Sequence, residues 1–400
     1  MPVPTLPEAL RRLYERIPLG MRLGLDPMRD ACARTGHPEQ AFPVVHVAGT
    51  NGKGSVSAMV EAIARAAHGG MRTGLYTSPH LCRFAERIRI DGEPVTDEAL
   101  ATLLGRALDD GPDLSFFETA TLAAFLAFRD ARVDLAIVEV GLGGRLDATN
   151  VVPLPRAAAI TRIALDHTDR LGTTLVEIAR EKAGIAKQGL DIVLGPMPAD
   201  VRAAIDEVAH AAGATTTMLD ARAPLPARIG LAGAHQQDNA RIAAELGRRI
   251  GAPPRAIEDG IAGVRWPGRL ERIGNVLLDA AHNPDGAEAL AAHVRSLGLP
   301  PEAVTLVFGT LADKDWAPML DTLAPLAAHR VYVAPSGASR SVVQPSAMVA
   351  RHAGAISASL PEALDASRQA RLTLVAGSLV LVGQARALLL GLPRDPPVAL

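Results

Sequence analysis

The segment from Gly49 to Ser55, Gly-Thr-Asn-Gly-Lys-Gly-Ser, has the composition of a loop that binds phosphate groups. It follows the apolar run Val44–Ala48, which predicts a strand, and precedes Ser55–Ala67, whose spacing predicts a helix. Backbone N–H groups and the helix N-terminus would face the phosphates, and Lys53 would neutralise them. The strict pattern requires a first glycine that four residues separate from the Gly-Lys pair, and serine or threonine directly after that pair. This chain has valine and glycine there, so a glycine-rich turn without a ligand is the alternative.

Lysine is rare in this chain, which makes each lysine position informative. Of 41 basic residues, four are lysines: Lys53, Lys182, Lys187 and Lys314. An ammonium group is a compact point charge and, when neutral, a nucleophile, and arginine replaces it in neither role. We therefore expect lysine to be enriched at functional positions, with Lys187 as the candidate for retention by chance.

Three polar residues lie at the ends of apolar runs that predict strands. Glu139 ends the run Val133–Val140, and Ser78 and His167 each follow another such run. The carboxyl ends of parallel strands share one edge of a sheet, so these side chains would converge. A carboxylate there is unfavourable unless it is paired or binds a metal. The alternatives are a turn or helix cap for Ser78 and a hydrogen-bonded loop histidine for His167, because imidazole is not a preferred Mg²⁺ ligand.

Apolar runs of strand length alternate with segments of helical period, which predicts an α/β fold with a mostly parallel sheet. The predicted strands are Val44–Ala48, Gly74–Thr77, Val133–Val140, Ala157–Ile163, Asp191–Gly195, Asn275–Ala280, Val304–Gly309, Arg330–Ala334 and Leu372–Ala376. The predicted helices are Ser55–Ala67, Thr96–Leu108, Phe116–Arg129, Thr174–Lys187, the helical region Gln236–Val264, and Leu379–Leu390. Proline and glycine at Trp266–Arg269 break the pattern. We therefore expect a P-loop-type domain over residues 1–268 and a smaller, Rossmann-like α/β domain over residues 269–400.

The composition excludes several classes of protein. With 48% hydrophobic residues, 21% charged residues and a formal net charge of −2, the chain is neither disordered nor a general nucleic-acid binder. Its apolar runs end well before the ~20 residues that span a bilayer, and its first 17 residues do not resemble a signal peptide. Cys32 and Cys82 are too few for a disulfide framework. We expect a cytoplasmic monomer without nucleic-acid or membrane partners.

The variant loop resembles that of the Mur ligase superfamily, whose members form amide bonds with ATP. Within it, the chain is similar to the bacterial dihydrofolate synthase / folylpolyglutamate synthase family along nearly its whole length. The segment between Pro196 and Gly233 is the poorest match. The matching segments are Gly49–Ser55, Tyr76–Leu81, Phe116–Thr119, Glu139–Asn150, Ala164–Thr168, Arg180–Ile185, His235–Gln236 with Asn239–Ala240, Pro267–Arg269, Asp279–Pro284, and Gly309 with Asp313–Asp315.

This resemblance implies a ligase that uses ATP and Mg²⁺ to add L-glutamate to dihydropteroate, to folyl-(poly)glutamate, or to both, through an acyl phosphate. Metal ions would neutralise charge on the phosphates. The implied ATP-binding residues are Gly49, Thr50, Asn51, Gly52, Lys53, Gly54, Ser55, Asn239, Arg269, Asp279 and His282. The implied ligands of one or two Mg²⁺ ions are Ser55, Ser78, Glu139, His167 and Lys182, the last as a carbamate. Lys53, Glu139, His167 and Lys182 form the implied catalytic set.

Several of these residues have plainer interpretations from the sequence alone. Lys182 is also readable as an exposed helix lysine, and Arg269 as a solvated linker charge. Asp279 and His282 precede Pro284 in a pattern that suits helix capping.

The resemblance also implies residues that bind the pterin-type substrate: Phe117, Glu118, Thr119, Arg145 and Leu146. Ser115 and Glu118 have the spacing of a capping box, so Glu118 has a structural interpretation beside the functional one. The Leu23–Asp26 stretch is a short match to a further part of a pterin pocket.

Two other functions remain open. Another Mur-type ligase would act on cell-wall or storage-peptide substrates, which the Phe116–Thr119 stretch disfavours. A regulator would bind ATP without ligating anything, which the joint presence of Glu139, His167 and Lys182 disfavours.

Overall fold

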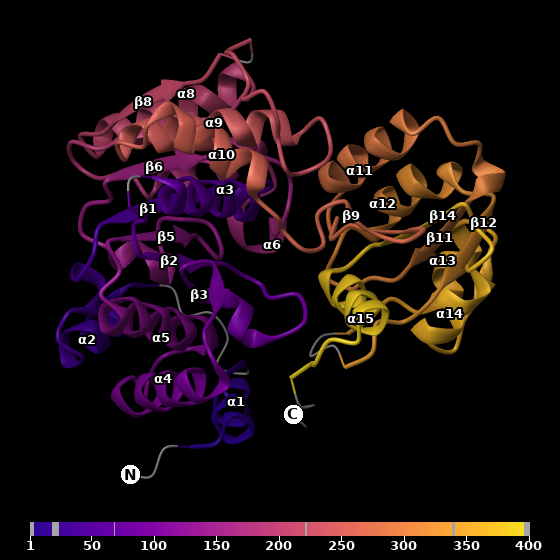
Figure 1. Ribbon diagram of the computed structural model, residues 1–400, viewed down its shortest axis with the longest axis horizontal. Helices are drawn as coiled ribbons and strands as arrows, with labels where there is room; N and C mark the ends of the chain where they lie inside the picture. Colours follow the sequence, from indigo (N-terminus) through magenta and orange to yellow (C-terminus); the bar gives the residue numbers. More distant parts are fainter. Residues whose placement is uncertain (1–3, 18–23, 68, 221, 338–340, 396–400) are drawn as a thin grey trace.

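Eight strands form a mostly parallel sheet in the computed structural model, which describes residues 4–17, 24–67, 69–220, 222–337 and 341–395 (Figure 1). In spatial order they are β4 (Glu93–Pro94), β3 (Ile88–Ile90), β2 (Thr73–Tyr76), β5 (Leu135–Glu139), β1 (Val44–Ala48), β6 (Ala157–Ile160), β7 (Asp191–Leu194) and β8 (Thr215–Met218). The β2–β3 and β3–β4 pairs are antiparallel, and the other pairs are parallel.

Helices cover both faces of this sheet because its strands alternate apolar side chains between two cores. One face packs on α1 (Leu6–Tyr14), α2 (Asp26–Arg34), α4 (Asp97–Asp110), α5 (Phe116–Ala131), α7 (Leu175–Ala183) and α8 (Ala199–Ala211). The other packs on α3 (Lys53–Ala66), α9 (Gln236–Arg249) and α10 (Pro254–Gly263). In β5, for example, Ala136 and Val138 belong to the first core, and Leu135 and Ile137 to the second.

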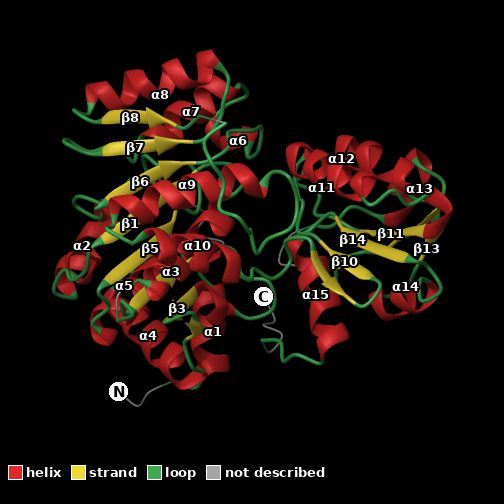
Figure 2. Cartoon of the chain, turned by 45° about the horizontal axis from the view of Figure 1, so that its top comes forward, coloured by secondary structure: helices red, strands yellow, loops and turns green. Residues whose placement is uncertain are grey.

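A second, separate sheet of six strands follows α10 (Figure 2). Its spatial order is β13 (Ala355–Ile356), β12 (His329–Tyr332), β11 (Val304–Phe308), β14 (Leu372–Ala376), β10 (Val276–Leu278) and β9 (Glu271–Ile273), with only β9 antiparallel to its neighbour. One core contains α11 (Pro284–Ser296), α12 (Trp316–Leu323) and α13 (Pro345–Arg351). The other contains α14 (Leu360–Ala366) and α15 (Leu379–Leu390).

The α/β fold with two sheets confirms the predicted class, and the predicted central strands lie within a few residues of their observed bounds. The helical region predicted over Gln236–Val264 is two helices, because Gly251 has φ 85° and two prolines follow it. The helix predicted over Thr174–Lys187 ends at Ala183, just before Gly184. The sequence did not predict β3, β4, β8, β9 or β13. No helix in the described part of the chain is long and apolar enough to cross a membrane.

The phosphate-loop helix α3 packs tightly against α10 at Gly260. A Cβ added to Gly260 would lie 2.5 Å from the backbone N and 2.6 Å from the Cα of Ile63. Backbone atoms in the middle of a buried helix cannot move aside, so this crossing depends on glycine. Gly263, at the end of the same helix, has no atom within 4 Å of its added Cβ.

We predict that Gly260→Ala lowers the free energy of unfolding by about 1–3 kcal/mol through overpacking. The matched control Gly263→Ala should leave it unchanged or raise it by up to about 1 kcal/mol, because alanine is the better helix former. Chemical denaturation of the purified variants measures both values. Equal unfolding midpoints for wild type and Gly260→Ala would contradict the prediction, because α3 and α10 would then move apart without loss of stability.

Candidate active site

The phosphate loop joins the end of β1 to the start of α3 in a conformation that requires its glycines. Gly49 has φ 142°, and an added Cβ would lie 1.9 Å from Oγ1 of Thr161. Gly52 has φ 93°, and its added Cβ would lie 2.4 Å from Oδ1 of Asn239 in α9. The Lys53 ammonium donates to the carbonyl oxygen of Thr50 at 3.1 Å, so it lies over the loop.

Glu139 is buried where β5 reaches the edge of the sheet that carries this loop. Its side chain accepts one hydrogen bond from the backbone N–H of Ser78 at 3.2 Å. No described lysine, arginine or histidine forms an ion pair with it within 4.0 Å. Burial raises the pKa of Glu139, and Lys53, the Ser78 N–H, Arg269 and Arg87 oppose that rise. A carboxylate in this position suits a bound cation.

His167 and Lys182 line the same cavity, and burial disfavours the charged form of each. His167 has φ 51° and follows β6; burial, then Lys314, lowers its pKa to about 4, so the imidazole is neutral at pH 7. Lys182 is 4% exposed, and burial, then the charge of Lys53, lowers its pKa to about 7. A neutral imidazole binds metals, and a neutral amine reacts with electrophiles. The exposed-lysine interpretation of Lys182 is therefore wrong.

The residues present fit a magnesium ion that substrate phosphates help to hold. In the described part of the chain, no three His, Cys, Asp or Glu side chains come close enough to form a metal site by themselves. The Glu139 carboxylate and the hydroxyls of Ser55 and Ser78 line one cavity beside the phosphate loop. Mg²⁺ binds such hard oxygen donors and commonly uses one or two carboxylates with phosphates and water.

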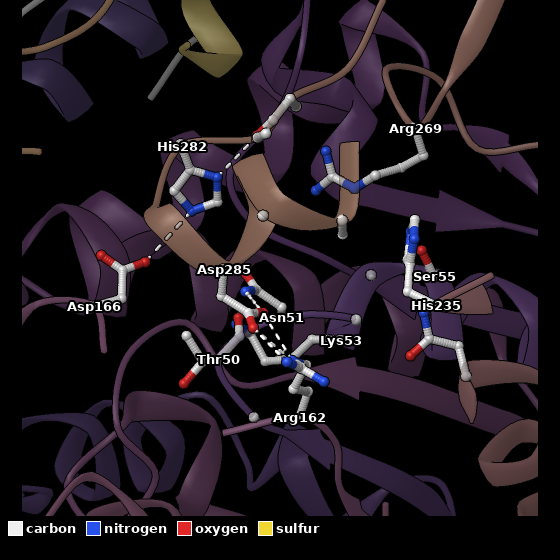
Figure 3. Close-up of a pocket in the computed structure, with 18 of the residues that line it drawn as sticks. Thr50, Asn51, Lys53, Ser55, Arg162, Asp166, His235, Arg269, His282 and Asp285 are labelled. Carbon is white, nitrogen blue, oxygen red and sulfur yellow. Dashed lines mark hydrogen bonds and ion pairs between the residues drawn. The ribbon is translucent and has the colours of Figure 1, made fainter. Parts of the chain in front are cut away.

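This cavity, about 620 Å³ in volume, lies between the two sheets (Figure 3). Every predicted ATP-binding or metal-binding residue lines it. From the second half of the chain, Asp279 accepts the backbone N–H groups of Leu270 and Ala281, both at 2.9 Å. His282 Nδ1 lies 2.9 Å from the carbonyl oxygen of Ala280. Both side chains thus shape the loop before α11, whose N-cap is Asn283.

Polar contacts that the sequence did not reveal join the two halves at the cavity. Asn51 exchanges side-chain hydrogen bonds with Asn283 at 3.2 and 3.0 Å and donates to Asp285 at 2.7 Å. Arg162 pairs with Asp285, with its Nη2 2.6 Å from Oδ1 (Figure 3). Lys314 donates to Asp166 at 2.9 Å. Asp166, Asn283 and Lys314 lie in segments that resemble the family, but the sequence implied no individual role for them and did not predict these contacts.

The predicted substrate residues lie outside this cavity: Phe117, Glu118, Thr119, Arg145 and Leu146. Glu118 forms the capping box of α5, accepting the Ser115 N–H at 2.8 Å, so its burial has a structural explanation. Arg145 pairs with Glu181 at 2.8 Å. Phe117 packs behind the cavity wall, since a Cβ on Gly141 would lie 2.2 Å from it.

Lys187 lies outside the cavity and makes structural hydrogen bonds. Its ammonium donates to the backbone oxygen of Asn150 at 3.1 Å and to Oδ1 of the same residue at 3.0 Å. Asn150 in turn donates to the carbonyl oxygens of Arg145 and Gly184. Lys187 therefore ties the glycine-rich loop to the end of α7. The Leu23–Asp26 stretch begins outside the described residues.

Both halves of the chain match known protein domain families. Residues 47–219 match the Mur ligase middle domain, and residues 268–383 match the glutamate ligase domain of Mur ligases. The phosphate loop and Glu139 fall in the first match, and Asp279 and His282 in the second. Both halves of the chain therefore match domains of Mur ligases.

Individual relatives identify a narrower family within the Mur ligases. The chain is 34% identical to folylpolyglutamate synthase of Lacticaseibacillus casei, over 89% of this chain and 92% of that protein. It is 34% identical to a probable bifunctional folylpolyglutamate synthase/dihydropteroate synthase of Haloferax volcanii, over 95% of this chain and 50% of the relative. The chain thus spans about half the length of the second relative. It belongs to the folylpolyglutamate synthase / dihydrofolate synthase family.

Solved structures agree with this assignment. E. coli FolC in complex with DHPP and ADP has a TM-score of 0.86 at 33% identity, covering 96% of this chain and 97% of that one. The Yersinia pestis bifunctional folylpolyglutamate synthase/dihydrofolate synthase with AMPPNP and a Mn ion has a TM-score of 0.86 at 30% identity, covering 96% and 98%. A further bifunctional enzyme structure, with Mn, AMPPNP and L-glutamate bound, has a TM-score of 0.84 at 31% identity, covering 97% and 99%.

The buried Lys182 amine gives a prediction for stability. Its folded pKa of about 7 lies below the 10.5 of an unperturbed lysine, so the unfolded state binds more protons between these values. In CO₂-free buffer without nucleotide, the unfolding free energy of wild type minus that of Lys182→Met should rise with pH from about 7 to 10.5. The slope is at most about 1.4 kcal/mol per pH unit. Parallel pH profiles of the two proteins, measured by denaturant titration, would contradict the burial argument.

Proposed function

We propose that this protein is an ATP- and Mg²⁺-dependent ligase that adds L-glutamate to dihydropteroate, to folyl-(poly)glutamate, or to both. The observation that carries the proposal is the convergence of a phosphate loop with Glu139, His167 and Lys182 on one cavity that the second sheet closes. Named relatives that bind ADP, AMPPNP, Mn, DHPP and L-glutamate support it.

The reaction joins a carboxylate to an amine in two steps. A carboxylate oxygen of the folate-type substrate attacks the γ-phosphorus of ATP, forming an acyl phosphate and releasing ADP. The amine of L-glutamate then attacks the acyl carbon, loses a proton and displaces inorganic phosphate, leaving an amide. Lys53 and the N-terminus of α3 would hold the phosphates and stabilise the transferred charge.

Each remaining residue has a separate role in this proposal. Glu139, Ser55, Ser78 and His167 would hold one or two Mg²⁺ ions, which neutralise phosphate charge when bound. Asn239 and Arg269, which also line the cavity, would contact the nucleotide together with Asp279 and His282. Phe117, Glu118, Thr119, Arg145 and Leu146 would support the pterin pocket behind the cavity wall.

Lys182 would act as a carbamate, formed when its neutral amine adds to CO₂ and loses a proton. Its burial, its lowered pKa and the absence of an ion-pair partner among the described residues support this role. The carbamate would replace a cation by an anion able to bind metal beside His167.

The two separate sheets support a domain boundary between residues 268 and 269. The first domain's last helix, α10, ends at Gly263, and the second sheet's first strand, β9, begins at Glu271. The two buried free cysteines, Cys32 and Cys82, support the proposed cytoplasmic location. We also propose that the protein acts as a monomer, because the residues proposed for ATP, metal, catalysis and substrate all belong to one chain.

A phosphate-release assay tests the proposed function. With ATP, Mg²⁺ and L-glutamate present, release should depend on adding dihydropteroate or a tetrahydrofolate. Lys53→Ala, which removes the phosphate countercharge, should abolish release while leaving the unfolding midpoint near that of wild type. Phosphate release by wild type that is independent of every pterin would reject the folate assignment.

The carbamate gives a second prediction. Lys182→Arg cannot form a carbamate and its guanidinium stays charged, so it should bind ATP but lose most ligation, with a lower unfolding midpoint because that charge is buried. Lys182→Ala should show a similar loss that short added carboxylates partly restore. The matched control Lys187→Arg lies near the same helix but outside the cavity and should keep near wild-type activity. Normal ligation by Lys182→Arg would reject the carbamate.

A further inference from the structure

Asp166 lines the cavity beside His167, and its carboxylate contacts groups from both halves of the chain. It lies on the loop after β6, directly before His167. Its Oδ1 accepts the backbone N–H of His167 and the ammonium of Lys314, both at 2.9 Å. Its Oδ2 accepts the Asn283 amide at 3.2 Å and lies 3.5 Å from Nε2 of His282 (Figure 3).

The three partners from the second sheet come from two different loops. His282 and Asn283 precede α11, and Lys314 lies between β11 and α12. The His282 ring is fixed from its other side, since Nδ1 lies 2.9 Å from the Ala280 carbonyl oxygen. A carbonyl can only accept, so Nδ1 carries a proton and Nε2 is the atom that faces Asp166. One carboxylate therefore sets the positions of both loops relative to β6.

Burial makes this tie stronger than the interdomain ion pair between Arg162 and Asp285. The side chains of Asp166 and Lys314 are each 10% exposed, whereas Arg162, which pairs with Asp285, is 61% exposed. Exposed pairs contribute little, but removing one member of a buried pair leaves an uncompensated charge.

We propose that Asp166 is a positioning residue for ligation: it fixes Lys314 and His282 of the second half against the edge that carries His167 and Glu139. It acts through these partners and need not touch substrate. The tie keeps the second sheet closed over the cavity, so that groups from both halves face the reacting atoms together. This role in catalysis rests on the proposed function, whereas the tie itself does not.

The test uses a double-mutant cycle on the full-length protein. Asp166→Asn keeps the shape and an acceptor oxygen but removes the charge, and Lys314→Met removes the partner. Each single variant should lower kcat about 10–100-fold while changing KM for ATP less than about threefold. The double variant should be no slower than the slower single variant, because the pair is already broken. If the two residues acted independently, their losses in kcat would multiply in the double variant, and this result would overturn the proposal.

A structural readout keeps the inference separate from the proposed function. Small-angle scattering without nucleotide should give a larger radius of gyration for Asp166→Asn and for Lys314→Met than for wild type. The matched control is Asp321→Asn, whose carboxylate also lies between a cation and a histidine, Arg351 and His352, but on the surface. It should match wild type in kcat and in size.

The outcomes separate the two proposals. If wild type releases no pterin-dependent phosphate, the proposed function fails, and the scattering series still decides whether the tie exists. If wild type ligates glutamate and Asp166→Asn does so at an unchanged kcat, only the positioning role fails. Unchanged radii of gyration in both variants would overturn the tie. If Asp166→Asn does not fold, Lys314→Met gives the same test from the other side.

Discussion

The site depends on ionisable side chains that are buried at one edge of a parallel sheet and have no ion-pair partner within 4.0 Å among the described residues. Glu139 accepts one hydrogen bond, from the Ser78 N–H, and Lys53, Arg269 and Arg87 stabilise its charge only from a distance. Burial disfavours the charged forms of both Glu139 and Lys182. A ligand that brings metal and phosphate would relieve both conditions at once. The cavity is thus chemically incomplete without its substrates, which is the property expected of a site that must bind a highly charged nucleotide.

The half of the chain that carries the second sheet supplies part of the cavity wall. The phosphate loop contacts the loop before α11 through Asn51, so the wall of the nucleotide cavity includes both halves of the chain. Neither half alone encloses the space between Lys53 and His282. In the proposed reaction, closure of the two halves would exclude water from the activated carboxylate, whose hydrolysis would otherwise compete with amide formation.

The sequence predicted what depends on local pattern and missed what depends on approach in three dimensions. The strand at Val44–Ala48 and the residues of the phosphate loop were evident because composition, spacing and flanking elements agreed. Strand β8 escaped prediction because its four residues are mostly threonine and only partly buried. Asp166, Asn283 and Asp285 gave no local signal, since their partners lie more than 100 residues away along the chain. Glu118 shows the opposite limit: its pattern supported two interpretations, and only the hydrogen bond to Ser115 explained its burial.

The distribution of lysine has a practical consequence for work with this protein. All four lysines lie in the described part of the chain, none is exposed, and Lys53 and Lys182 line the cavity. The surface carries its positive charge almost entirely as guanidinium groups, which amine-directed acylating reagents do not modify. A reagent such as an oxidised or activated-ester nucleotide would therefore meet very few competing side-chain amines. Affinity labelling of the phosphate loop should be unusually selective in this chain, and protection by unlabelled ATP would report directly on occupancy of the cavity.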